Sequence, residues 1–559
     1  MPSSAGQSVL GQRLIVASLS ILLFASSLAS AHDPPVRRAP RRPAALSTKK
    51  LTARTAPVCA LELELVDRAT GEPLPGIVQV LDAAGEVVPI AELVNRGQGI
   101  EDEGAIHRWH VLPHKSTIQV PAGPLVIKAL AGLETELADE RLDLTGRKQA
   151  SHTVKLTRFA RARRDGQVAG NTHLHLMKLS KEQADRYLRE VPLADGLDIV
   201  FLSYLERAEA DLEYTSNKYS PADLEKMSDD HVRFGHGEEH RHNFGSHGEG
   251  YGHLLLLDIP YIVRPVSIGP GIMREGNDAP PMQAGIDEAR RAGGKVIWAH
   301  NHFGYEDIPN WITGRVHANN IFDGSRRGSY KDTYYRYLNI GLRVPFSTGT
   351  DWFVYDFSRV YVAADRPITP TEWLDRLAAG RTYITNEPLL EFTVDGQPIG
   401  GTIELQQPRA VKVRGRAIGR GDFKRIELVH NGRAVRAAPS RREENHFVVE
   451  MDFELPIDGP SWLALRTPPP PVENDPELQE PVGENEFGGQ LFAHTSPVYV
   501  QFAGADVFDR DVARGLIDEM RADLKEIERQ AHFADEAQRI GVRRVYDEAI
   551  AVLEKRLGS

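Results

Sequence analysis

Apolar and polar positions alternate at the start of the first folded segment. Leu61, Leu63 and Leu65 are separated by single glutamates, and a Thr70–Gly71 turn signal precedes the apolar run Gly76–Leu81. A period of two is typical of a half-buried β-strand. Further short candidate strands follow at Ile118–Val120 and Leu125–Ala129. Several short strands separated by turns predict a β-sandwich over residues 57–157.

The pattern changes over residues 166–385, where strands alternate with helices. Ala194–Leu202 is typical of a helix end that leads into a buried parallel strand, and Leu338–Asp351 repeats this order. Gly285–Gly293 predicts a short helix before the strand Lys295–His300. Polar residues recur at the carboxyl ends of these strands, where α/β folds place their chemistry. This segment is therefore predicted to be an α/β domain that carries a site.

Residues 386–503 return to a β pattern, with candidate strands at Ala410–Gly415 and Arg425–His430. The Pro-rich stretch Pro468–Pro481 predicts an exposed loop. Over residues 505–559, apolar positions recur at helical spacing, for example at Leu516 and Met520. We expect a C-terminal hairpin of two helices that packs onto the body of the protein.

The N-terminus has the composition of an export signal. Arg13 precedes the apolar run Leu14–Phe24, and Ala29–Ser30–Ala31 fits a cleavage site. We expect residues 1–31 to be a signal peptide and residues 32–56 a disordered linker, with the mature protein periplasmic or extracellular and not stably inserted in a membrane. A single membrane anchor is the alternative. The only cysteine, Cys59, excludes internal disulfides.

The formal net charge of -11 argues against a generic nucleic-acid binder, and a small-molecule substrate is the expected partner. Histidines are unevenly spread, with 11 of the 20 falling between His173 and His317. His173 and His175 end an apparent strand, so both imidazoles point to one face. A chance pair of surface histidines is the competing interpretation. The neighbouring histidines, with Glu239 and Asp351, favour a metal site.

The order of these residues carries a family resemblance. His173-x-His175, Glu239 upstream of His253, then His300 and Gly349–Thr350–Asp351 resemble the motifs of PHP (polymerase and histidinol phosphatase) metallohydrolases. The phrases Gly380–Pro388 and Phe492–Val500 look similar to the CehA/McbA-type branch. The resemblance implies a distorted (β/α)₇ barrel, here flanked by N-terminal and C-terminal β-sandwich-like domains, with divalent metals at the strand ends and a hydrolytic activity.

Taken residue by residue, the resemblance implies six metal ligands: His173, His175, Glu239, His253, His300 and Asp351. Glu238 competes with Glu239, because a slip of one residue exchanges the faces of a strand.

Two of the family's ligands are missing. Its Thr-Asp-His phrase is replaced by Leu202–Glu206, in which Glu206 is the substitute considered, and Asp198 is expected to be a cap or turn residue. Phe353 stands where the family has a histidine after the late acid. The remaining histidines are open between a polar loop and the pocket: His236, His240, His242, His247 and His317.

Six nitrogen and oxygen ligands suffice for one or two divalent ions, with Zn, Mn and Fe left open. A bound ion activates water and polarises the substrate oxygen. Asp351 is a predicted catalytic residue, and His302 and Arg359 are candidates for charge stabilisation.

The expected function is an exported metal-dependent hydrolase of a phosphoester or a carbamate- or amide-like bond. The alternative is a catalytically degenerate barrel that binds a ligand or carbohydrate. The sequence leaves the oligomeric state open.

Overall fold

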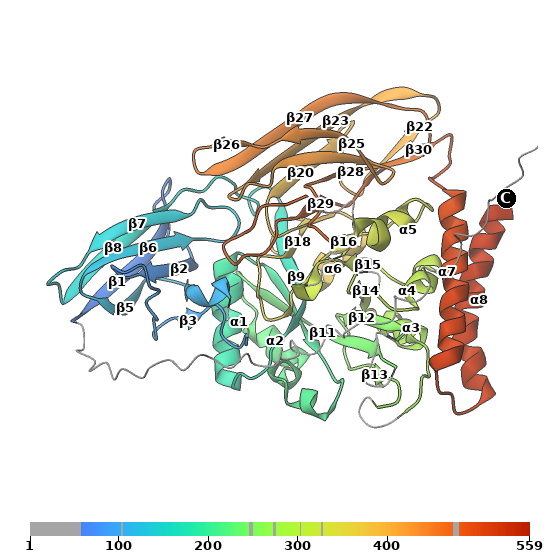
Figure 1. Cartoon of the computed structure of the whole chain (residues 1–559), viewed down its shortest axis with the longest axis horizontal. Helices are drawn as coiled ribbons and strands as arrows, with labels where there is room; N and C mark the ends of the chain where they lie inside the picture. Colours follow the sequence, from blue (N-terminus) through green and yellow to red (C-terminus); the bar gives the residue numbers. More distant parts are fainter. Residues whose placement is uncertain are drawn as a thin grey trace, which may run out of the picture. The chain divides into compact units, whose positions relative to one another are not determined.

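The computed structural model describes residues 57–101, 104–244, 250–271, 276–301, 303–325, 328–472 and 480–558. These residues form a mixed α/β structure in which strands in several sheets outnumber the eight helices (Figure 1). The predicted signal peptide and linker, residues 1–31 and 32–56, lie outside the described residues. Within the described ranges, no helix has the length and apolar character needed to span a membrane.

Two sheets near the N-terminus share one apolar core. The alternation of leucines produces β1 (Val58–Asp67), in which Leu61, Leu63 and Leu65 are buried, as the pattern predicts. The three-stranded sheet has β1 between β5 (Ser116–Pro121) and β8 (Gln149–Leu156). The second sheet has the order β3 (Val94–Asn95), β4 (His110–Leu112), β2 (Gly76–Leu81), β6 (Pro124–Leu130) and β7 (Ala138–Asp143).

The strands that carry the predicted ligands belong to one continuous set of pairings. In order of pairing these strands are β16 (Phe346–Ser347), β15 (Ala318–Asn320), β14 (Lys295–Ala299), β12 (Gly252–Leu257), β11 (Arg233–His242), β10 (Ile199–Tyr204), β9 (Gln167–His175) and β17 (Asp351–Trp352). All adjacent pairs are parallel except those of β12. Because β12 runs antiparallel, its first residues lie at the carboxyl ends of β11 and β14. His253 thereby pairs with Arg241 and Ala299.

The remaining strands of this network extend it toward the C-terminus. They are β13 (Ser267–Ile268), β18 (Arg359–Ala363), β19 (Thr382–Thr385), β22 (Thr402–Leu405), β24 (Arg425–His430), β25 (Arg433–Pro439), β28 (Ser461–Arg466), β29 (Ala493–Thr495) and β30 (Val498–Phe502). A separate five-stranded sheet has the order β21 (Gln397–Pro398), β20 (Leu389–Val394), β23 (Arg409–Gly419), β27 (His446–Ile457) and β26 (Arg441–Glu443).

Helix boundaries follow local capping chemistry. Ser180 and Gln183 form a capping box at the start of α1 (Lys181–Asp195), and Gly196 ends the helix in the left-handed conformation. The predicted helix at Gly285–Gly293 is α3, which begins earlier, at Met282, and ends at Arg291. The other short helices are α2 (Pro221–Met227), α4 (Asp307–Ile312), α5 (Arg336–Leu338) and α6 (Pro370–Ala378).

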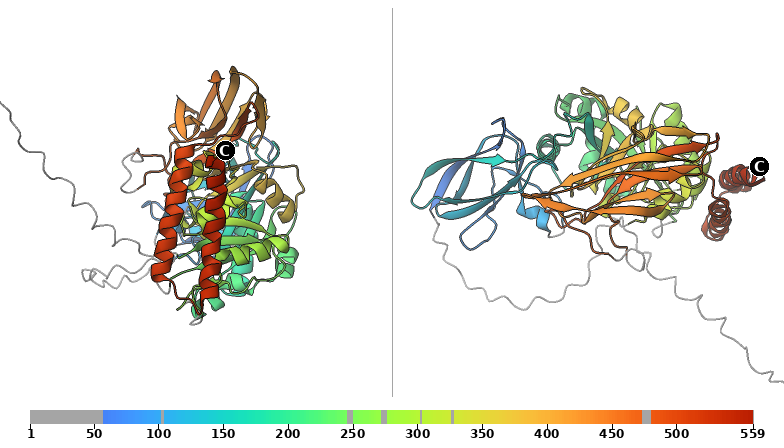
Figure 2. Two further views of the ribbon diagram at one scale, coloured as in Figure 1. Left: turned by 90° about the vertical axis from the view of Figure 1, so that its right-hand side faces the viewer. Right: turned by 90° about the horizontal axis from the view of Figure 1, so that it is seen from above.

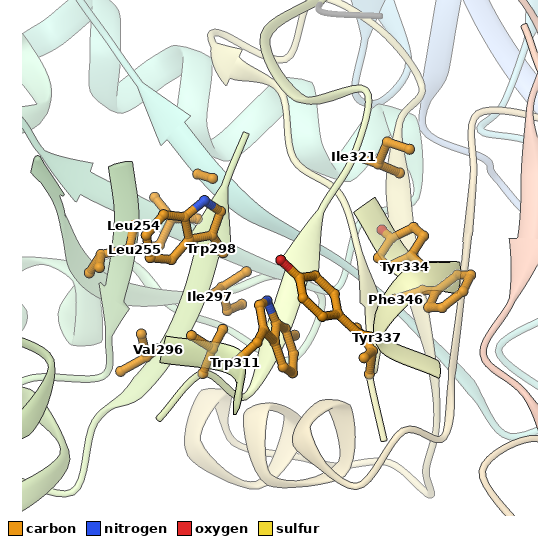
Figure 3. Packing of buried hydrophobic residues seen from close by; sticks show 14 of the residues in the cluster. Leu254, Leu255, Val296, Ile297, Trp298, Trp311, Ile321, Tyr334, Tyr337 and Phe346 are labelled. Atoms are coloured by element: carbon orange, nitrogen blue, oxygen red, sulfur yellow. The ribbon is translucent and has the colours of Figure 1, made fainter. Parts of the chain in front are cut away.

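A large apolar core supports the strands whose ends carry His253 and His300. Leu254–Leu257 of β12 are buried on both faces of the strand, which is typical of a strand covered on both sides. Figure 3 shows Trp298 of β14 beside Leu254 and Leu255, with Trp311 and Tyr337 nearby. Close packing of this kind restricts side-chain and backbone movement. The strand ends are therefore held on a rigid support.

The two C-terminal helices lie side by side, as the helical spacing predicts (Figure 2). They are α7 (Arg510–Gln530) and α8 (Glu536–Gly558), with Met520 and Val545 buried in the same core as α4. Arg521 of α7 and Glu554 of α8 form an ion pair at 2.8 Å. This pair is exposed and contributes little. The apolar stripe on each helix is what attaches the hairpin.

Candidate metal centre

His173 and His175 point to the same face of β9, and their Nε2 atoms lie 2.8 Å apart. His175 Nδ1 lies 2.9 Å from the backbone carbonyl oxygen of Ser203, which can only accept a hydrogen bond. His173 Nδ1 lies 2.8 Å from Asp323 Oδ2. With each Nδ1 donating to an oxygen, both Nε2 lone pairs face the same point, which is how metal-bound imidazoles are oriented.

The alternation of β11 separates the two competing glutamates. Glu238 faces away from the histidine pair: its Oε1 lies 3.1 Å from His240 Nδ1, and its Oε2 accepts a hydrogen bond from the Val263 backbone at 2.7 Å. Glu239 faces the pair, with Oε2 at 3.1 Å from His175 Nε2 and 3.7 Å from His173 Nε2. Of the two alternatives, Glu239 is the one placed among the predicted ligands.

The second oxygen of Glu239 faces another pair of histidines. Oε1 lies 3.3 Å from His253 Nδ1, at the start of β12, and 3.9 Å from His300 Nε2, directly after β14. Because the antiparallel β12 begins where β14 ends, these two imidazoles reach the carboxylate from neighbouring strands. Glu239 therefore stands between two groups of nitrogen ligands.

Asp351 completes the predicted set. Its Oδ1 lies 3.6 Å from the Nε2 atoms of both His173 and His175. The residue has a φ of 58°, in the left-handed region that aspartate tolerates better than most side chains. Such backbone conformations are common at functional sites. A Cβ on Gly324 would lie 2.7 Å from Asp351 Oδ2, so the turn beside this carboxylate has no room for a side chain.

The sequence reasoning missed Asp323, which lies in the turn after β15. Its Oδ2 lies 2.8 Å from His173 Nδ1 and 3.2 Å from His300 Nδ1, and it accepts a hydrogen bond from Asn320 Nδ2 at 2.8 Å. Asp323 thus orients one imidazole from each side of Glu239. The sequence signal was limited to position, because this acid follows the short strand β15 as His300 follows β14.

These side chains form three overlapping groups of buried atoms, each within 4.8 Å of one another: His173, His175, Glu239 and Asp351; His173, His300 and Asp323; and Glu239, His253 and His300. All six predicted ligands fall in these groups. Imidazole and carboxylate donors suit Zn, Mn or Fe. The residues are compatible with a divalent metal ion.

Burial and neighbouring charges act in opposite directions on the pKa values of the site residues. Burial lowers the pKa of His173, but the carboxylates of Asp323 and Asp351 raise it by more, so that it stands well above its usual value. Burial raises the pKa of Asp323, and the imidazoles of His173 and His300 outweigh that effect and lower it. For Asp351, burial prevails and the pKa is raised. The carboxylates therefore favour positive charge in this pocket, either as a proton or as a metal ion.

Arg359 and Glu206 lie outside the three groups. Arg359 donates to the carbonyl oxygens of Asp195 and Phe357, at 2.7 and 2.8 Å, because antiparallel β18 brings its start beside the middle of β9. These contacts do not support its predicted catalytic role. Glu206 is outside the three groups and accepts a hydrogen bond from Tyr204 at 2.8 Å. His302 lies outside the described residues.

Asp198, His242 and His317 make contacts outside the three groups. Asp198, just before β10, accepts a hydrogen bond from the Ala169 backbone at 2.8 Å and forms ion pairs with Arg163 and Arg366, each at 2.7 Å. His242 Nε2 lies 2.9 Å from Asp278, and His317 Nδ1 accepts a hydrogen bond from the Val296 backbone at 3.0 Å. His247 is outside the described residues.

Two arginines near the site also escaped the sequence reasoning. Arg241 is only 2% exposed, and its Nη1 lies 3.6 Å from Glu239 Oε1. Trp352 lies beside His175, with ring centroids 5.1 Å apart, and the guanidinium of Arg207 lies 5.3 Å above the Trp352 ring. Arg241 was predictable, because it is two residues from Glu239 on the same strand and therefore shares its face.

Gly349 is a sensitive position beside the histidine pair. A Cβ there would lie 2.6 Å from His173 Cβ and 3.2 Å from Asp323 Oδ1. We expect Gly349→Ala to displace His173 and to lower affinity for Mn²⁺ by roughly tenfold or more, since misplaced supporting groups cost about 10–100-fold. Isothermal titration calorimetry measures this change. Gly349→Ala with unchanged affinity and melting temperature would show that His173 has room to move.

Comparison with known proteins adds no family assignment: no protein-family model and no curated protein sequence matches the chain. The geometry of the buried groups is therefore the basis for any functional assignment, and the PHP resemblance stays a prediction from motifs.

Proposed function

We propose that this protein is a metal-dependent hydrolase of the PHP type. The observation that carries the proposal is the facing pair of Nε2 atoms of His173 and His175, 2.8 Å apart, with both Nδ1 atoms beside oxygen acceptors. Two lone pairs at this distance repel unless positive charge lies between or beside them. The carboxylates of Glu239 and Asp351 approach the same point, which supports a bound cation there.

The residues divide into ligands and positioning groups. His173, His175, Glu239 and Asp351 would hold the ion, while Asp323 and the Ser203 carbonyl fix the two imidazoles in the tautomer that presents Nε2. A divalent ion bound here supplies an activated water and polarises the bond to be broken. Trp352 is partly exposed beside His175 and would contact a substrate that reaches the ion.

The proposal also includes the type of barrel and the class of substrate. The run of pairings from β16 to β9 and on to β17 supports a distorted PHP-like barrel with the ligands at one end. We propose a small-molecule substrate with a phosphoester or a carbamate- or amide-like bond, cleaved after export to the periplasm or beyond the cell.

A catalytically degenerate barrel that binds a ligand is the second candidate, and Phe353 favours it. This residue occupies the position of a family ligand, is buried, and packs edge-on against Tyr187 with ring centroids 5.7 Å apart. Its phenyl ring has no lone pair and therefore cannot coordinate a metal ion. A centre with fewer ligands can hold metal without performing turnover.

The test is metal analysis combined with an assay. The purified protein is expected to contain a divalent ion or to take one up when Mn²⁺ or Zn²⁺ is added after chelation. Hydrolysis of p-nitrophenyl phosphate or of a p-nitrophenyl carbamate should then depend on that ion. A protein that neither contains nor recruits an ion would contradict the enzyme proposal. Metal binding with no turnover on either class would favour the ligand-binding alternative.

A further inference from the structure

We infer that the centre is mononuclear, with its ion at the His173–His175 side of Glu239, and that Arg241 supplies the positive charge at the other side. This inference rests on the proposed metal centre and specifies how many ions it holds. The two carboxylate oxygens of Glu239 have different surroundings.

Oε2 of Glu239 lies on the side of the site that holds the histidine pair and Asp351. It faces His175 Nε2 at 3.1 Å and His173 Nε2 at 3.7 Å, and Asp351 Oδ1 lies 3.6 Å from the same two nitrogens. Four side chains thus present ligand atoms to one point, enough to hold one ion of the Zn, Mn or Fe type.

Oε1 of Glu239 already faces a cation. Arg241 Nη1 lies 3.6 Å from this oxygen, a distance comparable with the 3.3 Å of His253 Nδ1 and the 3.9 Å of His300 Nε2. An arginine side chain stays protonated at any ordinary pH. A metal ion bound by Oε1, His253 and His300 would therefore share its carboxylate oxygen with a guanidinium.

The position and burial of Arg241 make this charge effective. Pairing with His253 across β11 and β12 fixes its backbone beside the site, and its Nε donates to Asn243 Oδ1 at 2.9 Å. The residue is 2% exposed, so solvent and salt screen its charge far less than they would at the surface. At the effective dielectric of a protein interior, a like charge a few ångströms away is strongly unfavourable.

The balance of buried charges also favours a single metal ion. Glu239, Asp323 and Asp351 together carry three negative charges when ionised, and all three are buried. One divalent ion and Arg241 neutralise them, whereas two divalent ions and Arg241 would leave an excess of positive charge in a buried site. Buried charge that is not compensated is costly. His253 and His300 are then positioning residues that face Glu239 and Asp323.

Metal stoichiometry tests the inference on the full-length protein. We expect wild type to bind one equivalent of Mn²⁺ in equilibrium dialysis and to give the electron paramagnetic resonance spectrum of an isolated ion. Arg241→Met removes the charge at similar length and should admit a second equivalent, with spin coupling between the two ions. Arg241→Lys, the matched control, retains the charge and should bind one equivalent. His253→Ala should keep one equivalent, and His175→Ala should lose it.

The outcomes separate the inference from the proposed function. No Mn²⁺ or Zn²⁺ bound by wild type overturns the metal centre itself. Two equivalents in wild type, or equal loss in His253→Ala and His175→Ala, would leave the metal centre in place and overturn the mononuclear assignment. If Arg241→Met does not fold, the wild-type count together with the two histidine variants still decides the matter.

Discussion

His175→Ala and Asp351→Ala are each expected to weaken binding of Mn²⁺ or Zn²⁺ by at least about 100-fold, because loss of a supporting group alone costs 10–100-fold and these side chains are ligands. His175 contributes the Nε2 that lies 2.8 Å from its partner in His173 and 3.1 Å from Glu239 Oε2. Asp351 contributes the carboxylate oxygen at 3.6 Å from both imidazoles.

The measurement is metal content after dialysis against a defined concentration of free ion, with circular dichroism to confirm folding. His430→Ala is the matched control, because this half-buried histidine lies in β24 and contacts Ser461 Oγ at 2.9 Å, outside the three groups. It should bind metal like wild type. Unchanged stoichiometry in both His175→Ala and Asp351→Ala would show that the ligand set is wrong.

The part of the site that follows strand periodicity could be predicted from the sequence. His173 and His175 share a face because they are two residues apart on a strand, and His300 follows directly on β14. The sequence could not choose between Glu238 and Glu239, since both lie within one strand of polar residues. In the structure, the alternation of β11 turns Glu239 toward His175 and Glu238 toward Val263.

Contacts between residues far apart in the chain could not be predicted from the sequence. Asp323 approaches His173 across 150 positions of the chain, from a turn that no periodic pattern announces. Arg359 was a candidate for charge stabilisation, and it stands only eight residues after Asp351. Strand β18 runs antiparallel to β9 and places Arg359 beside the carbonyl of Asp195. Proximity in sequence is a poor guide once the chain has reversed its direction.

The segment that follows Asp351 is anchored by elements far from it in the chain. Arg96, beyond β3, donates a hydrogen bond to the carbonyl oxygen of Val354, and the Tyr187 hydroxyl of α1 accepts one from the Val354 backbone N–H at 2.8 Å. Phe353 packs so closely on Gly99 that a Cβ there would lie 2.2 Å from its ring. The turn after β3 and helix α1 therefore contribute to the conformation of a candidate ligand loop.

Arg96→Met is expected to lower the free energy of unfolding by about 3–5 kcal/mol, the cost typical of removing one partner of a buried ion pair. Arg96 and Asp195 are both fully buried, and Arg96 Nε donates to Asp195 Oδ1 at 3.3 Å. The variant would leave the Asp195 carboxylate without its guanidinium partner and release the Val354 carbonyl. Urea denaturation followed by circular dichroism gives the change in free energy.

Arg96→Met combined with Asp195→Leu should recover most of the lost stability, because replacing both members of a buried pair with apolar side chains is often neutral or better. The exposed pair of Lys115 and Glu62, 2.7 Å apart, provides the matched comparison, and Lys115→Met should change stability by less than about 1 kcal/mol. If the double variant regains stability but still binds Mn²⁺ more weakly than wild type, the hydrogen bond to Val354 matters to the loop of Asp351 independently of the ion pair. Equal stability of Arg96→Met and wild type would contradict the role of this pair in holding the turn after β3 to the end of α1.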